Sequence, residues 1–504
     1  MTRTSETDPL RIDTFSLWNG RVGMTLCPGK TQPDGQSGSW SRQLAVDISA
    51  IDGWGATAVI TLMEAHELDR LRVPELPDEM MENFPTWVQA PIRDRHAPDA
   101  SFLKTWRYLR VYLAHHLLTQ GSIALHCMGG LGRTGTVAAM LCKDAGMSTS
   151  EAIALVRQTR PGTIETLAQE RFVENYEPEF TLTPETVRGA LMIWAGAAGD
   201  ALGYDVEFDR LTRIQQRYGR HGIHPSRLTT PPRVSDDTQM TLYALAALAD
   251  TPAPTLDTLR RGWLHWYAGQ AGLPDTASTP ALQRLTRDEQ VNQRQAPGGT
   301  CMSALADGGH GSMTQPINNS KGCGTVMRTA PIAMLPHAEI DELIELARAA
   351  AALTHGHRFA WDSAGLLTGA LALRIRHRSD PVTACCHLIK KHPSLIEGYE
   401  DLLLRALDAG HPRPRAADYG EGWVAEEALA IGLACAQADL MQHLSHVMAR
   451  AANHDGDSDS TAAIAAQLAG SIHLHDSDSV SLILRLDVFD AIADTLAAFY
   501  QTHH

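Results

Sequence analysis

The fold of the first part of this chain is decided by a run of ten residues, His126-Cys127-Met128-Gly129-Gly130-Leu131-Gly132-Arg133-Thr134-Gly135. An apolar run at 123–125 leads into it, and apolar residues at 137–141 follow it in a helical pattern. This order predicts a strand, a tight loop and the start of a helix. The N–H groups of such a loop and the helix dipole converge on one point, so the sequence predicts an anion-binding site.

Two side chains of this loop indicate chemistry on phosphate. The field that binds an anion also stabilises a thiolate, and cysteines in such places have pKa values of roughly 3.5–7.5. Arg133 carries a planar fork of donors that can hold two phosphate oxygens. We therefore predict a nucleophile at Cys127 and a phosphate clamp at Arg133. The cradle around the phosphate is predicted to consist of Met128, Gly129, Gly130, Leu131 and Gly132.

The ten residues resemble the signature loop of the cysteine-dependent protein phosphatases, especially the dual-specificity type. The resemblance implies that Cys127 attacks phosphorus, that Arg133 binds the phosphate and that Thr134 eases departure of the thiolate. It also implies that the segment 160–169 closes the site, with Gln169 as the residue that positions the hydrolytic water.

The leaving oxygen needs an acid, and the segment 87–94 resembles the acid-bearing loop of the same phosphatases. The resemblance assigns the acid to Asp94. Asp99 is the alternative, but Pro98 before it and helical residues after it favour a helix start there.

Bulk composition limits the function classes. The chain has 504 residues, more than one core of about 100–200 residues accounts for. Its formal net charge of −15 argues against bulk nucleic-acid binding and against an anionic membrane surface. The sequence shows no apolar signal segment and no apolar run of about 18 residues, so we expect no membrane span. The eight cysteines form no disulfide or zinc pattern, which favours a reducing cytoplasm. We expect Cys385 and Cys386 to be buried thiols.

The pattern of elements changes near residue 182, and we expect domains at 1–182 and 183–504. The first is predicted to be an α/β domain with a mostly parallel sheet. Its predicted strands cover 15–26, 56–63 and 122–125, and its predicted helices cover 42–54, 102–119, 133–145, 149–159 and 166–175. The second domain shows helical periodicity throughout, which predicts an all-α domain. Its longest irregular stretch, 297–324, is expected to lie near a site.

Two clusters of carboxylates and hydroxyls stand at predicted helix starts in the second domain, Ser235-Asp236-Asp237 and Asp457-Ser458-Asp459-Ser460. They offer only hard oxygen ligands, which suit Mg²⁺, Mn²⁺ or Ca²⁺. Simple N-capping is the alternative. A further Asp-Ser-Asp-Ser run at 476–479 lacks the Asn-His-x-Gly lead of residues 453–456, and we expect a surface loop there.

With the segments 189–208, 322–328, 354–357 and 422–428, these clusters resemble the ADP-ribosylglycohydrolase family, a helical fold with two divalent metals. The resemblance implies two Mg²⁺ ions, with Mn²⁺ as an alternative, held by Ser235, Asp236, Asp237, Asp457, Asp459 and Ser460. It implies an acid or base at Glu207. Three roles are open to His355 and His357, namely binding a transition metal, orienting the substrate or capping a helix. The resemblance favours a structural or substrate-side role. Asp455 departs from the family pattern, because a glycine is usual there.

The leading hypothesis is a bifunctional hydrolase that removes phosphate through Cys127 and cleaves an ADP-ribosyl bond with two Mg²⁺ ions, protein arginine being one candidate linkage. Its partners would be a phosphorylated substrate and an ADP-ribosylated protein or ADP-ribosyl metabolite. In one version both sites act on a single ADP-ribosyl phosphate metabolite. A second hypothesis makes the C-terminal domain an ADP-ribose-binding module that targets the phosphatase.

Overall fold

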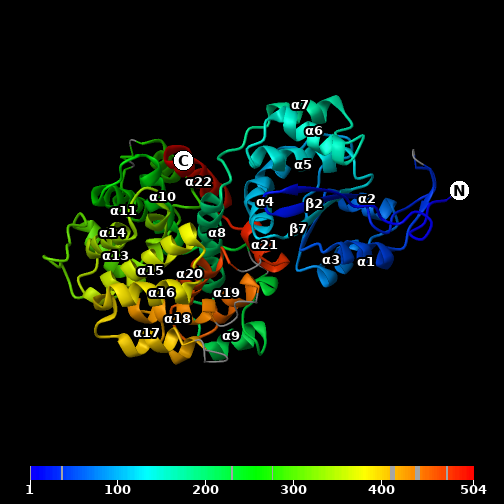
Figure 1. Ribbon diagram of the computed structural model, residues 1–504. Helices are drawn as coiled ribbons and strands as arrows, with labels where there is room; N and C mark the ends of the chain where they lie inside the picture. Colours follow the sequence, from blue (N-terminus) through cyan, green and yellow to red (C-terminus); the bar gives the residue numbers. More distant parts are fainter. Residues whose placement is uncertain are drawn as a thin grey trace. The chain divides into compact units, whose positions relative to one another are not determined.

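The computed structural model describes residues 2–35, 38–228, 231–274, 276–277, 279–408, 415–437, 443–472 and 475–504. The chain forms two compact units, Met1–Val187 and Arg188–His504, which are drawn in Figure 1. Helix α8 (Pro184–Tyr204) contains the point where one unit ends and the next begins.

The first unit is built on a five-stranded sheet with the order β1-β2-β7-β5-β6. Only the β1–β2 pair is antiparallel, while β2–β7, β7–β5 and β5–β6 are parallel. The predicted α/β unit with a mostly parallel sheet is therefore confirmed. The strands are β1 (Asp13–Leu17), β2 (Gly20–Leu26), β5 (Ala58–Thr61), β6 (Thr86–Gln89) and β7 (Ser122–Cys127), with a separate pair of β3 (Thr31–Gln32) and β4 (Trp40–Ser41).

Helices cover both faces of this sheet. Figure 1 shows α5, α6 and α7 on one face and α1 and α3 on the other. The helices of this unit are α1 (Leu44–Trp54), α2 (Ala65–Arg70), α3 (Leu76–Asn83), α4 (Ala100–Leu118), α5 (Gly132–Asp144), α6 (Thr149–Thr159) and α7 (Leu167–Asn175).

One expectation for this unit is wrong, and several short elements were not predicted. The single strand expected over 15–26 is a hairpin of β1 and β2, because Trp18 turns the chain with a φ of 49°. Strand β6 and the short helices α2 and α3 were not predicted. Each is only four to eight residues long, and so few residues hold too little periodicity to identify an element.

The regular elements of the second unit are α-helices and 3₁₀ turns, and its described residues contain no strand, which confirms the all-α prediction. Among its close helix pairs are α14 with α15, α18 with α20 and α10 with α22. Its α-helices after α8 are α9 (Leu211–Tyr218), α10 (Asp236–Ala249), α11 (Leu256–Gln270), α12 (Pro280–Arg287), α13 (Gly299–Ala306), α14 (Ile340–Ala352), α15 (Arg358–His377), α16 (Pro381–Lys391), α17 (Glu400–Ala406), α18 (Ala425–Gln437), α19 (Leu444–Ala452), α20 (Ser458–Ala469), α21 (Ser477–Leu484) and α22 (Phe489–His503). Short 3₁₀ turns are η1 (Pro225–Arg227), η2 (Cys323–Arg328), η3 (Ala330–Met334), η4 (Pro393–Ile396) and η5 (Ala416–Asp418).

Two expectations for the second unit are wrong. The run at 476–479 is not a surface loop, because Asp476 caps helix α21 by accepting a hydrogen bond from the Ser479 N–H. Cys386 is exposed although Cys385 is buried. Consecutive residues of a helix lie about 100° apart around its axis, so an apolar stretch does not bury both.

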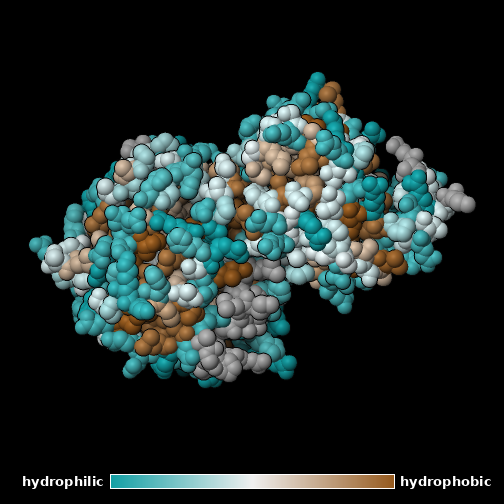
Figure 2. All heavy atoms as spheres, viewed as in Figure 1, coloured by the Kyte–Doolittle hydropathy of each residue, from teal (hydrophilic) through white to brown (hydrophobic). Residues whose placement is uncertain are grey.

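No helix among the described residues is long and apolar enough to cross a membrane. On the face drawn in Figure 2, hydrophilic residues are spread among the hydrophobic ones over both units.

Candidate active sites

The predicted phosphate-binding loop follows the central strand of the first unit. Cys127 ends β7 and is only 3% exposed, and α5 begins five residues later at Gly132. The turn between them depends on Gly130, which has a φ of +69° and whose added Cβ would lie 2.2 Å from the Thr25 carbonyl oxygen. Only glycine fits so close to a neighbouring strand, and the loop is thereby fixed against the end of β2 (Gly20–Leu26).

Arg133 is held from several directions. Its Nη1 and Nη2 atoms lie 2.6 and 3.0 Å from the two carboxylate oxygens of Glu67. Nη2 also lies 2.9 Å from Asp94 Oδ1. Burial alone would raise the pKa of Glu67, but the hydrogen bonds and charge of Arg133 outweigh it and hold that pKa below its usual value. The guanidinium is therefore charged and oriented before any anion binds.

The two acid candidates lie in different settings. Asp94 contacts Arg133, and its side chain is 44% exposed. Asp99 accepts a hydrogen bond from the Phe102 N–H at 2.9 Å and caps helix α4, as its sequence context predicted. The structure thus brings Asp94, and not Asp99, to the arginine of the loop.

The loop residues and their neighbours carry three further polar features. The Thr134 hydroxyl is buried and has no hydrogen-bond partner among the residues that the structure describes. Gln169 is buried, and its amide donates to the His96 carbonyl oxygen at 3.1 Å. The Gly132 N–H at the start of α5 donates to Glu165 Oε2 at 2.9 Å. Glu165 therefore occupies one of the amides predicted to bind phosphate.

A buried lysine lies behind the loop. Lys30 Nζ donates to the Met128 carbonyl oxygen at 3.2 Å and lies 4.3 Å from the centre of the Trp40 ring. Burial lowers the pKa of Lys30 to about 8, against the opposing effect of Cys27 and Cys127. The ammonium therefore adds positive potential beside the predicted nucleophile.

A hollow of about 370 Å³ adjoins the loop at Leu131. Both positive and negative side chains line it. Arg160 forms an ion pair with Asp13 at 2.7 Å and donates a hydrogen bond to the Gly129 carbonyl oxygen at 3.1 Å. Its lining consists of Asp8, Pro9, Arg11, Asp13, Leu26, Trp40, Arg42, Leu131, Arg160 and Pro161.

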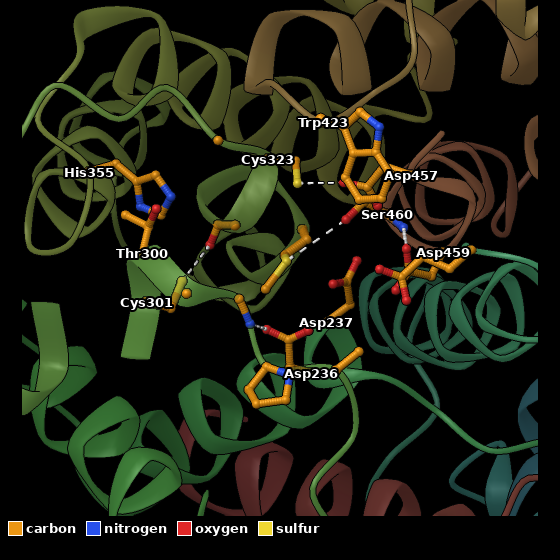
Figure 3. Close-up of a pocket in the computed structure, with 18 of the residues that line it drawn as sticks. Asp236, Asp237, Thr300, Cys301, Cys323, His355, Trp423, Asp457, Asp459 and Ser460 are labelled. Carbon is orange, nitrogen blue, oxygen red and sulfur yellow. Dashed lines mark hydrogen bonds between the residues drawn. The ribbon is translucent and has the colours of Figure 1, made fainter. Parts of the chain in front are cut away.

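In the second unit, the two carboxylate clusters meet in one cleft of about 710 Å³ (Figure 3). This volume is ordinary for a site that binds a small molecule. Asp236, Asp237, Asp457, Asp459 and Ser460 all line it, together with Glu207. The irregular stretch 297–324 supplies Pro297 to Cys301 and Gly322 to Gly324 to the same wall, so the prediction that it lies near a site is confirmed, although it contains the short helix α13.

The carboxylates of this cleft repel one another. Oxygen atoms of Glu207, Asp457 and Asp459 all lie within 4.8 Å of each other. Burial and then the nearby carboxylates raise the pKa of Glu207 to about 9, and burial is also the main cause that raises the pKa of Asp236 to about 8. The charged form of these carboxylates is therefore costly unless a cation enters the cleft.

The donor set fits a divalent metal. Every predicted ligand offers a hard oxygen. Asp237 Oδ2 and Glu207 Oε2 are buried, and neither has a hydrogen-bond partner among the described residues. Buried polar atoms normally have partners, so these two oxygens are available to a ligand.

Helix α10 brings its acidic start into the cleft through a residue that the sequence argument did not single out. The carboxylate of Asp200 on α8 accepts hydrogen bonds from the Ser235 N–H at 2.9 Å and from the Thr238 N–H at 3.0 Å. Ser235 itself is absent from the cleft lining, and its hydroxyl accepts a hydrogen bond from the Asp237 N–H at 3.2 Å. In this structure Ser235 caps α10.

The remaining predicted positions divide between the cleft and its surroundings. His355 lines the cleft, and burial lowers its pKa to about 3, so it is neutral. His357 caps α15 through the Phe359 N–H. Asp455 is exposed and lies outside the cleft lining, where its carboxylate accepts a hydrogen bond from the Leu211 N–H at 2.6 Å.

Sequence reasoning missed one feature at the mouth of this cleft. Phe208 and Trp423 are 74% and 39% exposed, and their rings stack with centroids 6.4 Å apart. Both residues line the cleft. An exposed aromatic pair offers a flat apolar surface to a planar group.

Comparison with known proteins finds a family model for each part of the chain. Residues 182–502 match the family model described as ADP-ribosylglycohydrolase. Residues 38–173 match the model described as Swiss Army Knife protein, DSP-PTPase phosphatase domain.

Individual relatives match parts of the chain. The human protein tyrosine phosphatase type IVA 3 is 29% identical over 137 residues, which are 27% of this chain and 73% of that protein. The zebrafish (Danio rerio) dual specificity protein phosphatase CDC14AB is 49% identical over 47 residues, 9% of this chain and 8% of that protein. A solved structure titled ADP-ribosylglycohydrolase-related protein complex is 23% identical, covers 64% of this chain and 100% of that chain, and has a TM-score of 0.43.

The two family matches indicate hydrolase activities for both domains. With its helical unit, its acidic cleft and the match over residues 182–502, the chain belongs to the ADP-ribosylglycohydrolase family, and a phosphatase domain of the dual-specificity type precedes that domain.

Proposed function

We propose that the chain is a bifunctional hydrolase, which releases phosphate at Cys127 and ADP-ribose at the acidic cleft. The domain limits 1–182 and 183–504 are part of this proposal. The observation that carries it is that each of the two units holds a separate set of buried, oriented polar groups of the kind its chemistry needs.

At the first site, Cys127 Sγ attacks phosphorus, and the bond to the leaving oxygen breaks. Arg133, oriented by Glu67, binds two phosphate oxygens and offsets their charge. Asp94 gives its proton to the leaving oxygen and then takes a proton from the water that hydrolyses the cysteinyl phosphate. The exposure of Asp94 supports this role, because an acid that serves a bound substrate must reach the mouth of the site.

When water hydrolyses the cysteinyl phosphate, the Cys127 thiolate is the leaving group. The hydroxyl of Thr134 is free to donate to the departing thiolate, and Gln169 is placed beside the loop to orient the water. The loop amides from Met128 to Arg133 hold the phosphate meanwhile.

At the second site, Asp236, Asp237, Asp457, Asp459 and Ser460 would hold two Mg²⁺ ions, with Mn²⁺ as an alternative, and Ser235 would join them by leaving its cap. The bound metal would orient the ribose hydroxyls and water while charge develops at the anomeric carbon. Glu207 moves the proton of the reaction, a role supported by its place in the cleft lining beside the proposed metal ligands.

The cleft also favours a nucleotide-like substrate. Phe208 and Trp423 offer a stacking surface for a planar base at its mouth, and His355 is a neutral hydrogen-bonding group further in. We take ADP-ribosyl-arginine on protein as the first linkage to test and the reducing cytoplasm as the compartment that suits a thiolate enzyme.

The test measures free ADP-ribose released from a protein that carries ADP-ribosyl-arginine. We expect release that needs Mg²⁺ and that Asp236→Ala abolishes. Asp455→Ala is the matched control, because it removes a carboxylate outside the cleft lining, and it should retain release. Tight ADP-ribose binding by the wild type without any turnover in Mg²⁺ would overturn the proposal. It would favour the second hypothesis, in which the C-terminal domain is an ADP-ribose-binding module that targets the phosphatase.

A further inference from the structure

A cysteine lies among the oxygen atoms of the acidic cleft. Cys323 Sγ donates a hydrogen bond to Asp457 Oδ2 at 2.7 Å (Figure 3). Ser460 and Asp237 line the same cleft as Cys323. The sulfur therefore contacts one residue of the proposed metal centre and shares the cleft with two others.

The backbone keeps the thiol in this place. The Cys323 N–H donates to the Trp423 carbonyl oxygen at 3.1 Å, and Gly322 forms an antiparallel bridge with Val424. Cys323 then begins the 3₁₀ turn η2. With its own backbone and that of Gly322 held in this way, the sulfur reaches the cleft without any movement of a loop, as a preorganised ligand must.

A second observation at the site indicates a ligand rather than a closed hydrogen-bond network. Asp237 Oδ2 lies in the same cleft, is buried and has no hydrogen-bond partner among the described residues. Figure 3 shows the Asp237 side chain directed toward the space near Ser460 and Asp459. A buried carboxylate oxygen left in this way costs free energy unless a cation or donor enters.

We propose that Cys323 is a metal ligand, and that its sulfur with Asp457 and Ser460 makes a mixed sulfur–oxygen position that takes a thiophilic divalent cation such as Zn²⁺ or Co²⁺. The inference rests on the proposed metal centre and adds a donor to it. Thiolate favours Zn²⁺ over Mg²⁺, which prefers an all-oxygen shell. On binding, the S–H bond breaks, the sulfur gives its electron pair to the metal and the proton leaves to water.

Cys301 provides a matched control within the same cleft. It also lines the cleft, but its sulfur accepts from Arg328 Nη1 at 3.3 Å. A cationic neighbour at that distance disfavours a second cation. The proposal therefore assigns metal binding to one of two cleft thiols.

The experiment titrates Co²⁺ into the full-length protein without oxygen and records the thiolate-to-cobalt charge-transfer absorption in the near ultraviolet. We expect the wild type and Cys301→Ser to share a saturable band that Cys323→Ser lacks, since serine keeps a donor of similar size but no sulfur. The inference is overturned if the band persists in Cys323→Ser, or if the wild type shows none.

Competition between metals provides the second readout. Cys323→Ser should weaken Zn²⁺ binding by at least ~10-fold while changing Mg²⁺ affinity by less than about twofold. Equal losses for both metals, or no loss of Zn²⁺ affinity, would overturn the inference.

ADP-ribose release by the wild type in Mg²⁺ is measured in parallel, so that a failure of the proposed hydrolase activity can be distinguished from a failure of the proposed sulfur ligand. Release without the cobalt band would refute the sulfur ligand alone. A band without release would refute the proposed hydrolase activity and leave the metal site standing.

Discussion

At the scale of single residues, Glu165 presents a carboxylate to an amide that the phosphate would use. Its Oε2 accepts the Gly132 N–H at 2.9 Å. A carboxylate beside a phosphate dianion costs binding energy through like-charge repulsion, and glutamine keeps the shape without the charge. We expect Glu165→Gln to lower the inhibition constant of inorganic phosphate by about 5–10-fold, equivalent to ~1 kcal/mol.

The measurement is inhibition of p-nitrophenyl phosphate hydrolysis by inorganic phosphate. Glu170→Gln, on the helix α7 that follows Glu165, is a suitable control, since Glu170 pairs with Arg157 and not with the loop. Equal or weaker inhibition of the Glu165 variant would contradict the assignment of this amide to phosphate.

The residues that could be predicted from the sequence are those whose partners are close in the chain. Cys127 and Arg133 share one loop, and Asp94 stands in a recognisable segment. The contacts of Glu67 and Lys30 with the loop could not be predicted, because both residues come from segments far from it in the sequence. Neither residue belongs to a short motif that indicates a catalytic role. The capping pattern Glu64-Ala65-His66-Glu67 was the one available signal, and it indicates only a helix start.

At the scale of elements, a buried polar group ties helices α4 and α5 together in the first unit. Arg110 Nε lies 2.7 Å from Asp144 Oδ1, and the Tyr176 hydroxyl donates to the same oxygen at 3.0 Å. Asp144→Ala would leave a buried guanidinium without its counter-charge, which costs about 3–5 kcal/mol. Tyr176→Phe removes this neutral donor and also the acceptor of the Trp106 indole N–H at 2.9 Å, and should cost about 1–3 kcal/mol.

Urea unfolding of the full chain, followed by loss of phosphatase activity, measures both changes. The account requires the Asp144 variant to unfold at clearly lower urea than the Tyr176 variant. Similar midpoints would mean that water enters and solvates Arg110, and that the pair contributes little to stability.

Elements were predictable where they are long. The helices α4, α5 and α6 were expected within one or two residues of their observed limits, and so was the strand β7. The misses include the short strand β6 and the helices α2 and α3, whose formation depends on packing against the sheet rather than on their own periodicity. The helix α21 was missed because its Asp-Ser-Asp-Ser start has the same residue types as the predicted metal cluster at 457–460, although in the structure it caps a helix.

At the scale of the whole molecule, removal of divalent metal should act on one unit alone. A metal at ~100 times its dissociation constant stabilises a protein by about 2.7 kcal/mol, which for a unit of this size is about 5 °C. We expect EDTA to lower the calorimetric melting temperature of the unit Arg188–His504 by that amount and to leave the other transition in place. In Asp236→Ala, this unit should melt at the same temperature with and without EDTA. If EDTA lowered its melting temperature as much in the variant as in the wild type, the proposed metal site would be contradicted.

The measurement that tests the central claim most directly is a cross-assay of two variants for both activities. Release of phosphate from p-nitrophenyl phosphate and of ADP-ribose from ADP-ribosyl-arginine protein in Mg²⁺ would be followed for the wild type, Cys127→Ser and Asp236→Ala. Two independent hydrolase sites predict that Cys127→Ser loses at least ~10³-fold of phosphate release only, and that Asp236→Ala loses ADP-ribose release only. Loss of both activities in either folded variant would contradict the account.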